Sequence, residues 1–179
     1  MLLTVIKRME GDDYTVHQVL ARKFQNQKIL FQRWNGLVQV LSSDPAAGHG
    51  RWISVKDKIE GIKAGDVLNF TIRINPTVSK KDDDSRRRGS VKSVPASDLK
   101  RWLDNKFIKC GFWANYEFSK EGFRESVKAG TIIAINSVLV YGKLEVLNPA
   151  DVKNALLTGI GRGKGLGYGM LHIYGDLVA

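Results

Sequence analysis

Two side chains near the start of the sequence have the types and spacing needed for acid–base chemistry. Tyr14 and His17 stand three residues apart in "DDYTVHQVLARKF", a stretch that predicts a helix capped by Asp12 or Asp13. This spacing brings both side chains to one side of a helix. Imidazole exchanges protons between about pH 5 and 8, so His17 is a candidate general acid or base. Tyr14 is a candidate to orient a hydroxyl group or to share the proton transfer.

The same helix also offers His17 a purely structural role. Val16, Leu20 and Phe24 are four residues apart and predict an apolar stripe that faces the core. At ~100° per residue, His17 lies ~60° from the centre of this stripe, at the border of the core. A core-edge histidine bonded to the backbone is therefore the alternative for His17, and simple packing is the alternative for Tyr14.

A second stretch, "TGIGRGKGLGYGML" at 158–171, places six glycines within eleven residues, with Arg162 and Lys164 between them. It is not a P-loop, because Gly165 stands where the magnesium-binding hydroxyl belongs and the loop follows a helix instead of a strand. It also lacks the third glycine of a dinucleotide-binding fingerprint. Glycines allow a phosphodiester backbone to approach closely, and cations meet its oxygens. Gly161, Arg162 and Lys164 are thus predicted to bind phosphates, with a flexible turn as the alternative.

The charge of the chain favours a polyanionic partner. Among 179 residues, 28 are Lys or Arg and 18 are Asp or Glu, which gives a net charge of +10. Cys110 is the only cysteine, so no intrachain disulfide forms, as is typical of a reducing cytoplasm. No signal peptide and no stretch of about 20 apolar residues is present, so a soluble, cytoplasmic protein is expected. No cluster has metal-ligand spacing, and His172 is expected to be structural in a core strand.

The order of predicted elements is similar in the two halves of the chain, which indicates an α+β fold. We expect two tandem ferredoxin-like βαββαβ domains with antiparallel sheets, the second helix of the first domain being reduced. The domains are predicted at 1–88 and 92–179, joined by a charged linker or mobile loop at 79–93. The expected strands are 2–9, 29–33, 37–41, 66–74, 113–118, a hairpin over 131–147 that turns near Tyr141-Gly142, and a last strand at 168–175. The expected helices are 14–24, one that follows Pro95, and 149–158, with Asn148 as its N-cap.

Four landmarks occur in the same order as in a known family. They are "YTVHQVLARKF", "FTIRINP" at 70–76, "GSVKSVPASDLKRWL" at 89–103, and the glycine loop with its lysine followed by "GYGML". In this order they resemble the CasE family of repeat-cleaving endoribonucleases, within the RAMP superfamily of CRISPR-associated RNA-binding proteins. The resemblance spans nearly the whole chain.

The resemblance implies two ferredoxin-like domains and a metal-independent endoribonuclease without a cofactor. Such an enzyme cleaves CRISPR precursor RNA at the 3′ base of the repeat stem-loop, leaving a 2′,3′-cyclic phosphate and a 5′-hydroxyl. The mature crRNA then stays bound, together with other subunits of a Cascade-type complex. The implied catalytic residues are His17, Tyr14 and Lys92. The implied RNA-binding residues are Arg22, Lys23, Arg73, Arg86, Arg87, Arg88, Gly161, Arg162 and Lys164.

Two other functions fit the same residues. A non-catalytic crRNA-binding subunit of a CRISPR effector complex would keep the fold and the basic surface without the chemistry. A ribosomal or other basic RNA-binding module would show no preference for a CRISPR repeat. Loss of His17 without loss of RNA binding separates the cleavage chemistry of the endoribonuclease from the binding of the non-catalytic subunit.

Overall fold

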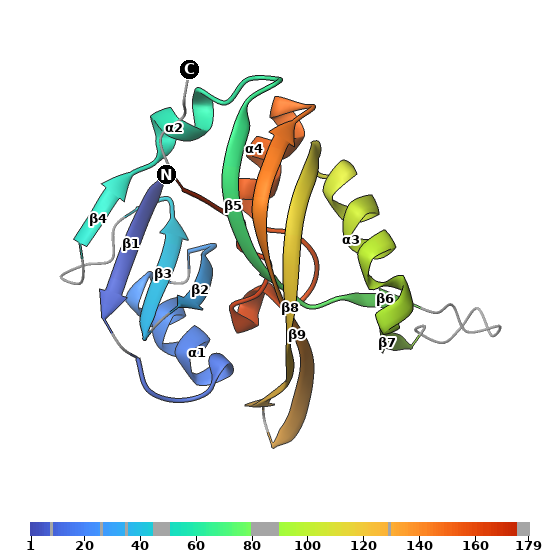
Figure 1. The fold of residues 1–179 in the computed structure, drawn as a ribbon. Helices are drawn as coiled ribbons and strands as arrows, with labels where there is room; N and C mark the ends of the chain where they lie inside the picture. Colours follow the sequence, from blue (N-terminus) through green and yellow to red (C-terminus); the bar gives the residue numbers. More distant parts are fainter. Residues whose placement is uncertain are drawn as a thin grey trace, which may run out of the picture.

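The structure is a computed structural model that describes residues 1–7, 9–25, 27–34, 36–44, 51–79, 90–128 and 130–174. Within these ranges the chain forms two four-stranded antiparallel sheets, the first with one helix and the second with two helices packed on one face (Figure 1). In both sheets the first strand lies between the third and the fourth, as in a ferredoxin-like βαββαβ unit. The predicted α+β class is confirmed.

The first sheet has the strand order β2-β3-β1-β4, and helix α1 covers one of its faces. The expected reduced second helix is α2, which has five residues and follows β4 instead of preceding it. In chain order the elements are β1 (Leu2–Lys7), α1 (Asp13–Lys23), β2 (Leu30–Trp34), β3 (Leu37–Ser42), β4 (Arg51–Ser54) and α2 (Lys56–Glu60).

Helix α1 forms where the capping and periodicity signals place it. The Asp12 side chain accepts a hydrogen bond from the Thr15 backbone N–H at 2.8 Å, which satisfies a donor that a helix start leaves without a partner. The apolar stripe of α1 is fully buried against strands β2 and β3. The packed residues are Val16, Leu20, Phe24, Phe31, Val38 and Val40.

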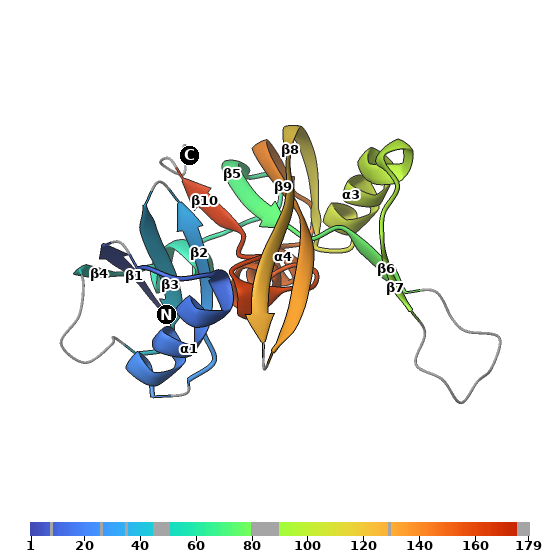
Figure 2. The ribbon, with the colours of Figure 1, turned by 90° about the horizontal axis from the view of Figure 1, so that it is seen from below.

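The second sheet has the order β10-β5-β9-β8, and helices α3 and α4 pack on one face of it. A two-stranded ribbon, β6 and β7, projects from the end of β5 (Figure 2). The elements are β5 (Val67–Ile74), β6 (Thr77–Ser79), β7 (Val91–Ser93), η1 (Ala96–Asp98), α3 (Leu99–Ile108), β8 (Phe112–Lys128), β9 (Thr131–Val146), α4 (Pro149–Thr158), η2 (Lys164–Leu166) and β10 (His172–Tyr174).

Strand β5 belongs to the second sheet, which corrects the assignment of strand 66–74 to the first half of the chain. It pairs with β9 along its whole length and with β10 at its centre. The fourth strand of the first sheet is instead the short β4, in a region whose sequence is irregular. The domain ranges 1–88 and 92–179 stay a prediction, and the pairing of β5 favours a boundary before residue 67.

The predicted hairpin turn near Tyr141-Gly142 is wrong. Both residues lie inside β9, which pairs with β8 over nearly its whole length. Gly142 faces the neighbouring strand so closely that a Cβ atom would collide with the backbone of Asn115 and Tyr116. Glycine at position 142 therefore allows two strands to approach closely and does not form a turn.

None of the helices in the described ranges is long and apolar enough to span a membrane.

Candidate RNA-cleavage site

His17 and the glycine loop meet where the two sheets adjoin. Helix α1 packs against η2, the short helical turn that begins at Lys164. A Cβ atom placed on Gly165 would lie 3.8 Å from both Cε1 and Nε2 of His17. A surface cavity of about 350 Å³ lies beside them, lined among others by His17, Lys28, Thr158, Lys164 and Gly165. Two motifs far apart in the sequence thus form one site.

The imidazole of His17 is half-buried and held by packing. Its ring stacks on Phe31, with centroids 6.0 Å apart and an interplanar angle of 22°. The Nδ1 atom is buried and has no hydrogen-bond partner among the described residues. The ring edge with Cε1 and Nε2 faces the glycine loop and the cavity. A histidine bonded to the backbone, the structural alternative, is therefore not what the described residues form.

The loop glycines serve two different purposes. Five of the six, all except Gly165, have φ between 74° and 86°, a conformation that side-chain-bearing residues rarely adopt. Gly165 has no such φ, and a Cβ atom there would contact only His17. Backbone bonds fix the loop: Gly169 N–H donates to the Arg73 carbonyl and Ile160 N–H to the Gly169 carbonyl, both at 2.7 Å. The path of the loop requires five glycines, whereas Gly165 keeps space open beside the imidazole.

Two lysines line the cavity with His17. Lys164 is half-buried and comes from the predicted loop, while Lys28 is exposed and precedes β2. Ammonium groups at such positions attract the phosphates of a bound polyanion. No motif in the sequence marks Lys28. It enters the site because the chain leaves α1 and returns beside the glycine loop, a proximity that only the fold creates.

The other predicted residues of α1 lie near the site without lining the cavity. Tyr14 is half-buried one turn before His17, on the same helix. Arg22 is exposed and Lys23 half-buried in the last turn, where positive charge also suits the helix dipole.

Lys92 is exposed on β7 and does not lie beside His17. In Figures 1 and 2 the β8–β9 hairpin stands between the β6–β7 ribbon and α1. Arg162 is exposed and donates a 2.8 Å hydrogen bond to Ser79 Oγ of β6, so it connects the glycine loop with the ribbon. Gly161 packs near Ile74, with φ of 80°. The predicted contacts Arg86, Arg87 and Arg88 lie outside the described residues.

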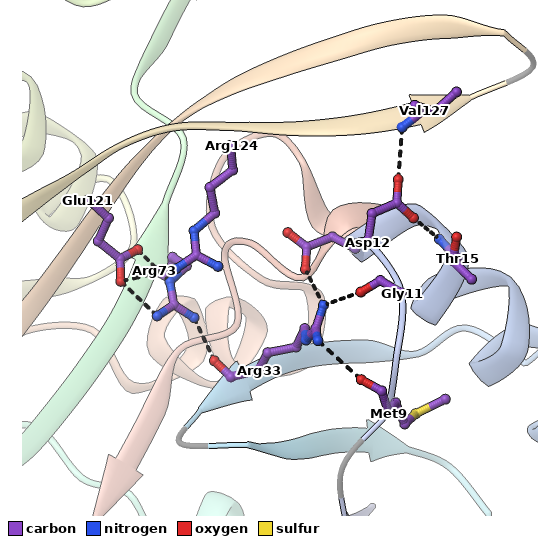
Figure 3. A network of polar contacts seen from close by, with 10 residues as sticks. Met9, Gly11, Asp12, Thr15, Arg33, Arg73, Glu121, Arg124 and Val127 are labelled. Carbon is purple, nitrogen blue, oxygen red and sulfur yellow. Dashed lines mark hydrogen bonds and ion pairs between the residues drawn. The ribbon is translucent and has the colours of Figure 1, made fainter.

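The guanidinium of Arg73, which is predicted to contact RNA, makes hydrogen bonds within the protein. Its guanidinium donates to both carboxylate oxygens of Glu121, at 2.6 and 2.8 Å, and to the Arg33 carbonyl at 2.6 Å (Figure 3). Ser137 Oγ donates to the same carboxylate at 2.5 Å. Burial favours a raised pKa for Glu121, but the hydrogen bonds from Arg73 and Ser137 outweigh it and lower the pKa. Arg73 therefore joins strand β8 to the edge of the first sheet.

Asp12 ties the start of α1 to the tip of the hairpin. Its second carboxylate oxygen accepts a 2.8 Å hydrogen bond from the Val127 backbone N–H of β8 (Figure 3). Beside it, Arg33 donates to the carbonyls of Met9 and Gly11 at 3.1 and 2.8 Å. Residues of both sheets thus hold the start of the helix that carries His17. Among the described residues, no group of three or more His, Cys, Asp or Glu side chains is placed to hold a metal ion.

Fold and site together define an α+β protein of two ferredoxin-like sheets, with a histidine, two lysines and a glycine loop where the sheets adjoin. Residues 4–174 match the family model described as CRISPR associated protein, and the chain belongs to this family. The match covers almost the whole chain and confirms the resemblance to CRISPR-associated proteins.

A curated relative and two solved structures are similar to the chain. CRISPR-associated endoribonuclease Cse3 of Thermus thermophilus is 28% identical in an alignment 127 residues long, which covers 63% of this chain and 57% of the relative. The alignment thus spans just over half of the relative's length. The structure of Thermus thermophilus Cse3 bound to an RNA representing a pre-cleavage complex has a TM-score of 0.73 at 20% identity, covering 97% of this chain and 98% of that one. The CRISPR-associated protein Cas6e from Escherichia coli str. K-12 has a TM-score of 0.75 at 21% identity, covering 97% and 98%. Both structures share the fold.

Proposed function

We propose that this protein is an endoribonuclease that cleaves CRISPR precursor RNA at the 3′ base of the repeat stem-loop. The observation that carries the proposal is the edge of the His17 imidazole, which faces Gly165 and Lys164 beside a cavity. The family match and the name of the Thermus thermophilus relative, an endoribonuclease, support the choice of substrate and reaction.

The chemistry uses the nucleophile that RNA itself carries. A base takes the proton of the 2′-hydroxyl, the oxygen attacks the adjacent phosphorus, and the bond from phosphorus to the 5′-oxygen breaks. An acid protonates the departing oxygen, so the products are a 2′,3′-cyclic phosphate and a 5′-hydroxyl. His17 is assigned one or both proton transfers. Tyr14, one turn earlier on the same helix, is assigned to orient the 2′-hydroxyl or share the proton.

The cations divide into two groups, those that line the cavity beside His17 and those that lie elsewhere. Lys164 and Lys28 line the same cavity as His17 and are placed to stabilise negative charge on the reacting phosphate. Lys92 and Arg162 lie on or against the β6–β7 ribbon, so we assign both to RNA binding away from the reacting bond, in place of the catalytic role predicted for Lys92. Arg22 and Lys23 extend the basic surface along α1.

The processed RNA is proposed to stay bound and to carry the protein into a Cascade-type effector complex in the cytoplasm. Structured RNA would be gripped through phosphates and A-form shape, which suits cations spread over α1, the glycine loop and the ribbon. No described group is placed as a metal site, and the proposed reaction assigns no step to a metal or cofactor.

A non-catalytic crRNA-binding subunit is the second candidate, and one observation favours it. No described residue accepts a hydrogen bond from Nδ1 of His17, so nothing described fixes the tautomer of the ring. A catalytic histidine is often oriented by such a partner.

The chemistry of the products separates the two candidates. Repeat RNA is incubated with the protein, and the fragment ends are identified by mass spectrometry. The proposal expects a cyclic phosphate and a 5′-hydroxyl at a single site, and no cleavage of RNA carrying one 2′-deoxy nucleotide just before the cut. Binding of both RNAs without cleavage of either would favour the second candidate.

A further inference from the structure

A larger cavity, of about 510 Å³, lies between the faces of the two sheets that no helix covers. Gln32 and Gln39 contribute from the first sheet, on the face opposite the residues that pack under α1. Thr71, on the second sheet, alternates along β5 with Phe70 and Ile72 of the core. None of the residues lining this cavity lines the cavity beside His17. A volume between about 300 and 1,000 Å³ is typical of small-ligand sites.

The second sheet presents one row of side chains to this cavity. His172 on β10 pairs with Thr71 on β5, and Thr71 pairs with Tyr141 on β9. The three residues therefore stand side by side across three strands, and all of them line the cavity. Tyr174 stands two positions beyond His172 and lines it as well. This row forms one wall, and the two glutamines form the other.

The cavity holds hydrogen-bonding capacity that the protein does not use. Thr71 is 9% exposed, and its Oγ1 is buried without a hydrogen-bond partner among the described residues. A buried hydroxyl in this state is costly unless something binds to it. Gln32 Nε2 donates to Gln39 Oε1 at 2.6 Å, which leaves one amide oxygen and one amino group of the pair for a ligand. A donor and an acceptor thus lie together opposite the unpartnered hydroxyl.

The cavity also offers a flat aromatic surface. The rings of His172 and Tyr174 are stacked, with centroids 6.1 Å apart and an interplanar angle of 20°. Burial lowers the pKa of His172, so its ring is neutral near pH 7 and presents one donor and one acceptor nitrogen. A cation stands nearby, because Lys143 lies two residues after Tyr141 on the same face of β9. Near the other end, Arg73 bridges the two sheets through its bond to the Arg33 carbonyl.

We propose that this inter-sheet cavity binds a single unpaired nucleobase, supplied by a single-stranded segment of RNA. A flat heterocycle with donors and acceptors on its edge matches the stacked rings, the amide pair and the Thr71 hydroxyl together. The adjoining phosphate would meet Lys143. An apolar peptide would leave the hydroxyl and the amide groups unpaired, so it matches the lining less well. The inference rests on the proposed function only in taking RNA as the source of the base.

Two substitutions test the site, and one control matches the first of them. Thr71→Val removes the buried hydroxyl while keeping the side-chain shape, so the fold should tolerate it. Thr4→Val is its control, because Thr4 Oγ1 is also buried without a described partner but lies on β1 beside Val40, under α1. Tyr174→Ala removes an exposed stacking ring without opening the core.

Fluorescence anisotropy measures the binding of fluorescein-labelled hexanucleotides of A, C, G and U. Calorimetry measures the binding of the four mononucleotides. For at least one base we expect affinity about fivefold weaker with Thr71→Val and about tenfold weaker with Tyr174→Ala, and no change with Thr4→Val. Tighter binding of the hexanucleotide than of the mononucleotide assigns the base to an RNA strand. Equal binding supports the base site but assigns it to a free nucleotide.

Wild-type affinity in both variants would overturn the proposal. Failure of wild-type protein to bind any of these probes would also overturn it and leave the cavity to a protein partner. The probes carry no stem-loop and the readout is binding, so the result does not depend on cleavage.

Discussion

Gly165 leaves empty the position from which a side chain would touch His17, since its Cβ would stand 3.8 Å from Cε1 and Nε2 of the imidazole. That distance is an ordinary van der Waals contact, and the φ of Gly165 is not left-handed. Neither backbone conformation nor a clash therefore requires glycine at this position. The remaining reason is that a substrate approaches the imidazole there, and this reason can be tested.

The first prediction is that Gly165→Ala lowers cleavage without lowering stability. The methyl group fits the protein alone but occupies the space beside the imidazole, so the single-turnover rate should fall about 10- to 100-fold. Thermal unfolding should show an unchanged Tm. The matched contrast is Gly163→Ala, because φ of 86° at Gly163 makes any side chain strained and should lower stability by about 1 kcal/mol. Wild-type cleavage by Gly165→Ala would show that the space beside His17 has no role.

The second prediction concerns the two lysines of the cavity. Lys164→Ala and Lys28→Ala should each weaken binding of repeat RNA and reduce the slope of log Kd against log salt by about 0.7–0.9, since each removes one phosphate contact. Kd is measured by filter binding between about 50 and 300 mM KCl. Lys63→Ala serves as the control, because Lys63 is exposed in the turn before β5, outside this cavity. Slopes equal to that of the control would remove both lysines from the site.

The third prediction links the tie between Glu121 and Arg73 to acid stability. The pKa of Glu121 lies below its ordinary 4.5, so the folded state prefers the charged carboxylate. The contribution to stability is therefore complete above about pH 4.5 and is lost as the pH falls through the folded pKa. Glu121→Gln should cost about 1.5–3 kcal/mol at pH 7, because hydrogen bonds to a charged group are lost.

Urea unfolding of both proteins at pH 7, 5 and 3.5 measures this difference. The gap between wild type and Glu121→Gln should narrow as the solution becomes acidic. A difference in the free energy of unfolding that stays constant down to pH 3.5 would contradict this prediction. It would mean that protonation of the Glu121 carboxylate does not weaken its bond to Arg73.

Local signals in the sequence predict the helices well and the sheet membership poorly. Asp12 caps α1 and Asn148 caps α4 as expected, because capping depends on residues within one turn. The alternation of Val67–Ile74 predicts a strand equally well in either sheet, since the pattern does not identify its partner. Gly142 similarly indicates a turn in isolation, whereas the structure uses it where two strands approach closely.

The residues of the candidate site likewise fall into those that local sequence signals identify and those that only the tertiary structure brings in. The spacing of Tyr14 and His17 and the composition of the glycine loop are local, so the sequence alone identifies them. Lys28 joins the site only through tertiary proximity. Arg73 is a plausible cation for RNA by its type, but the acidic partner that engages it lies 48 residues away, on β8.

The central claim is that His17 cleaves CRISPR repeat RNA without a metal, and one gel tests it directly. End-labelled repeat RNA from the source genome is incubated in EDTA with wild-type protein and with His17→Ala. The account predicts cleavage at one site by wild type, a loss of about a hundredfold or more in rate for His17→Ala, and similar RNA binding by both. Tight binding by both proteins with no cleavage by wild type, or equal cleavage by the two, would contradict it.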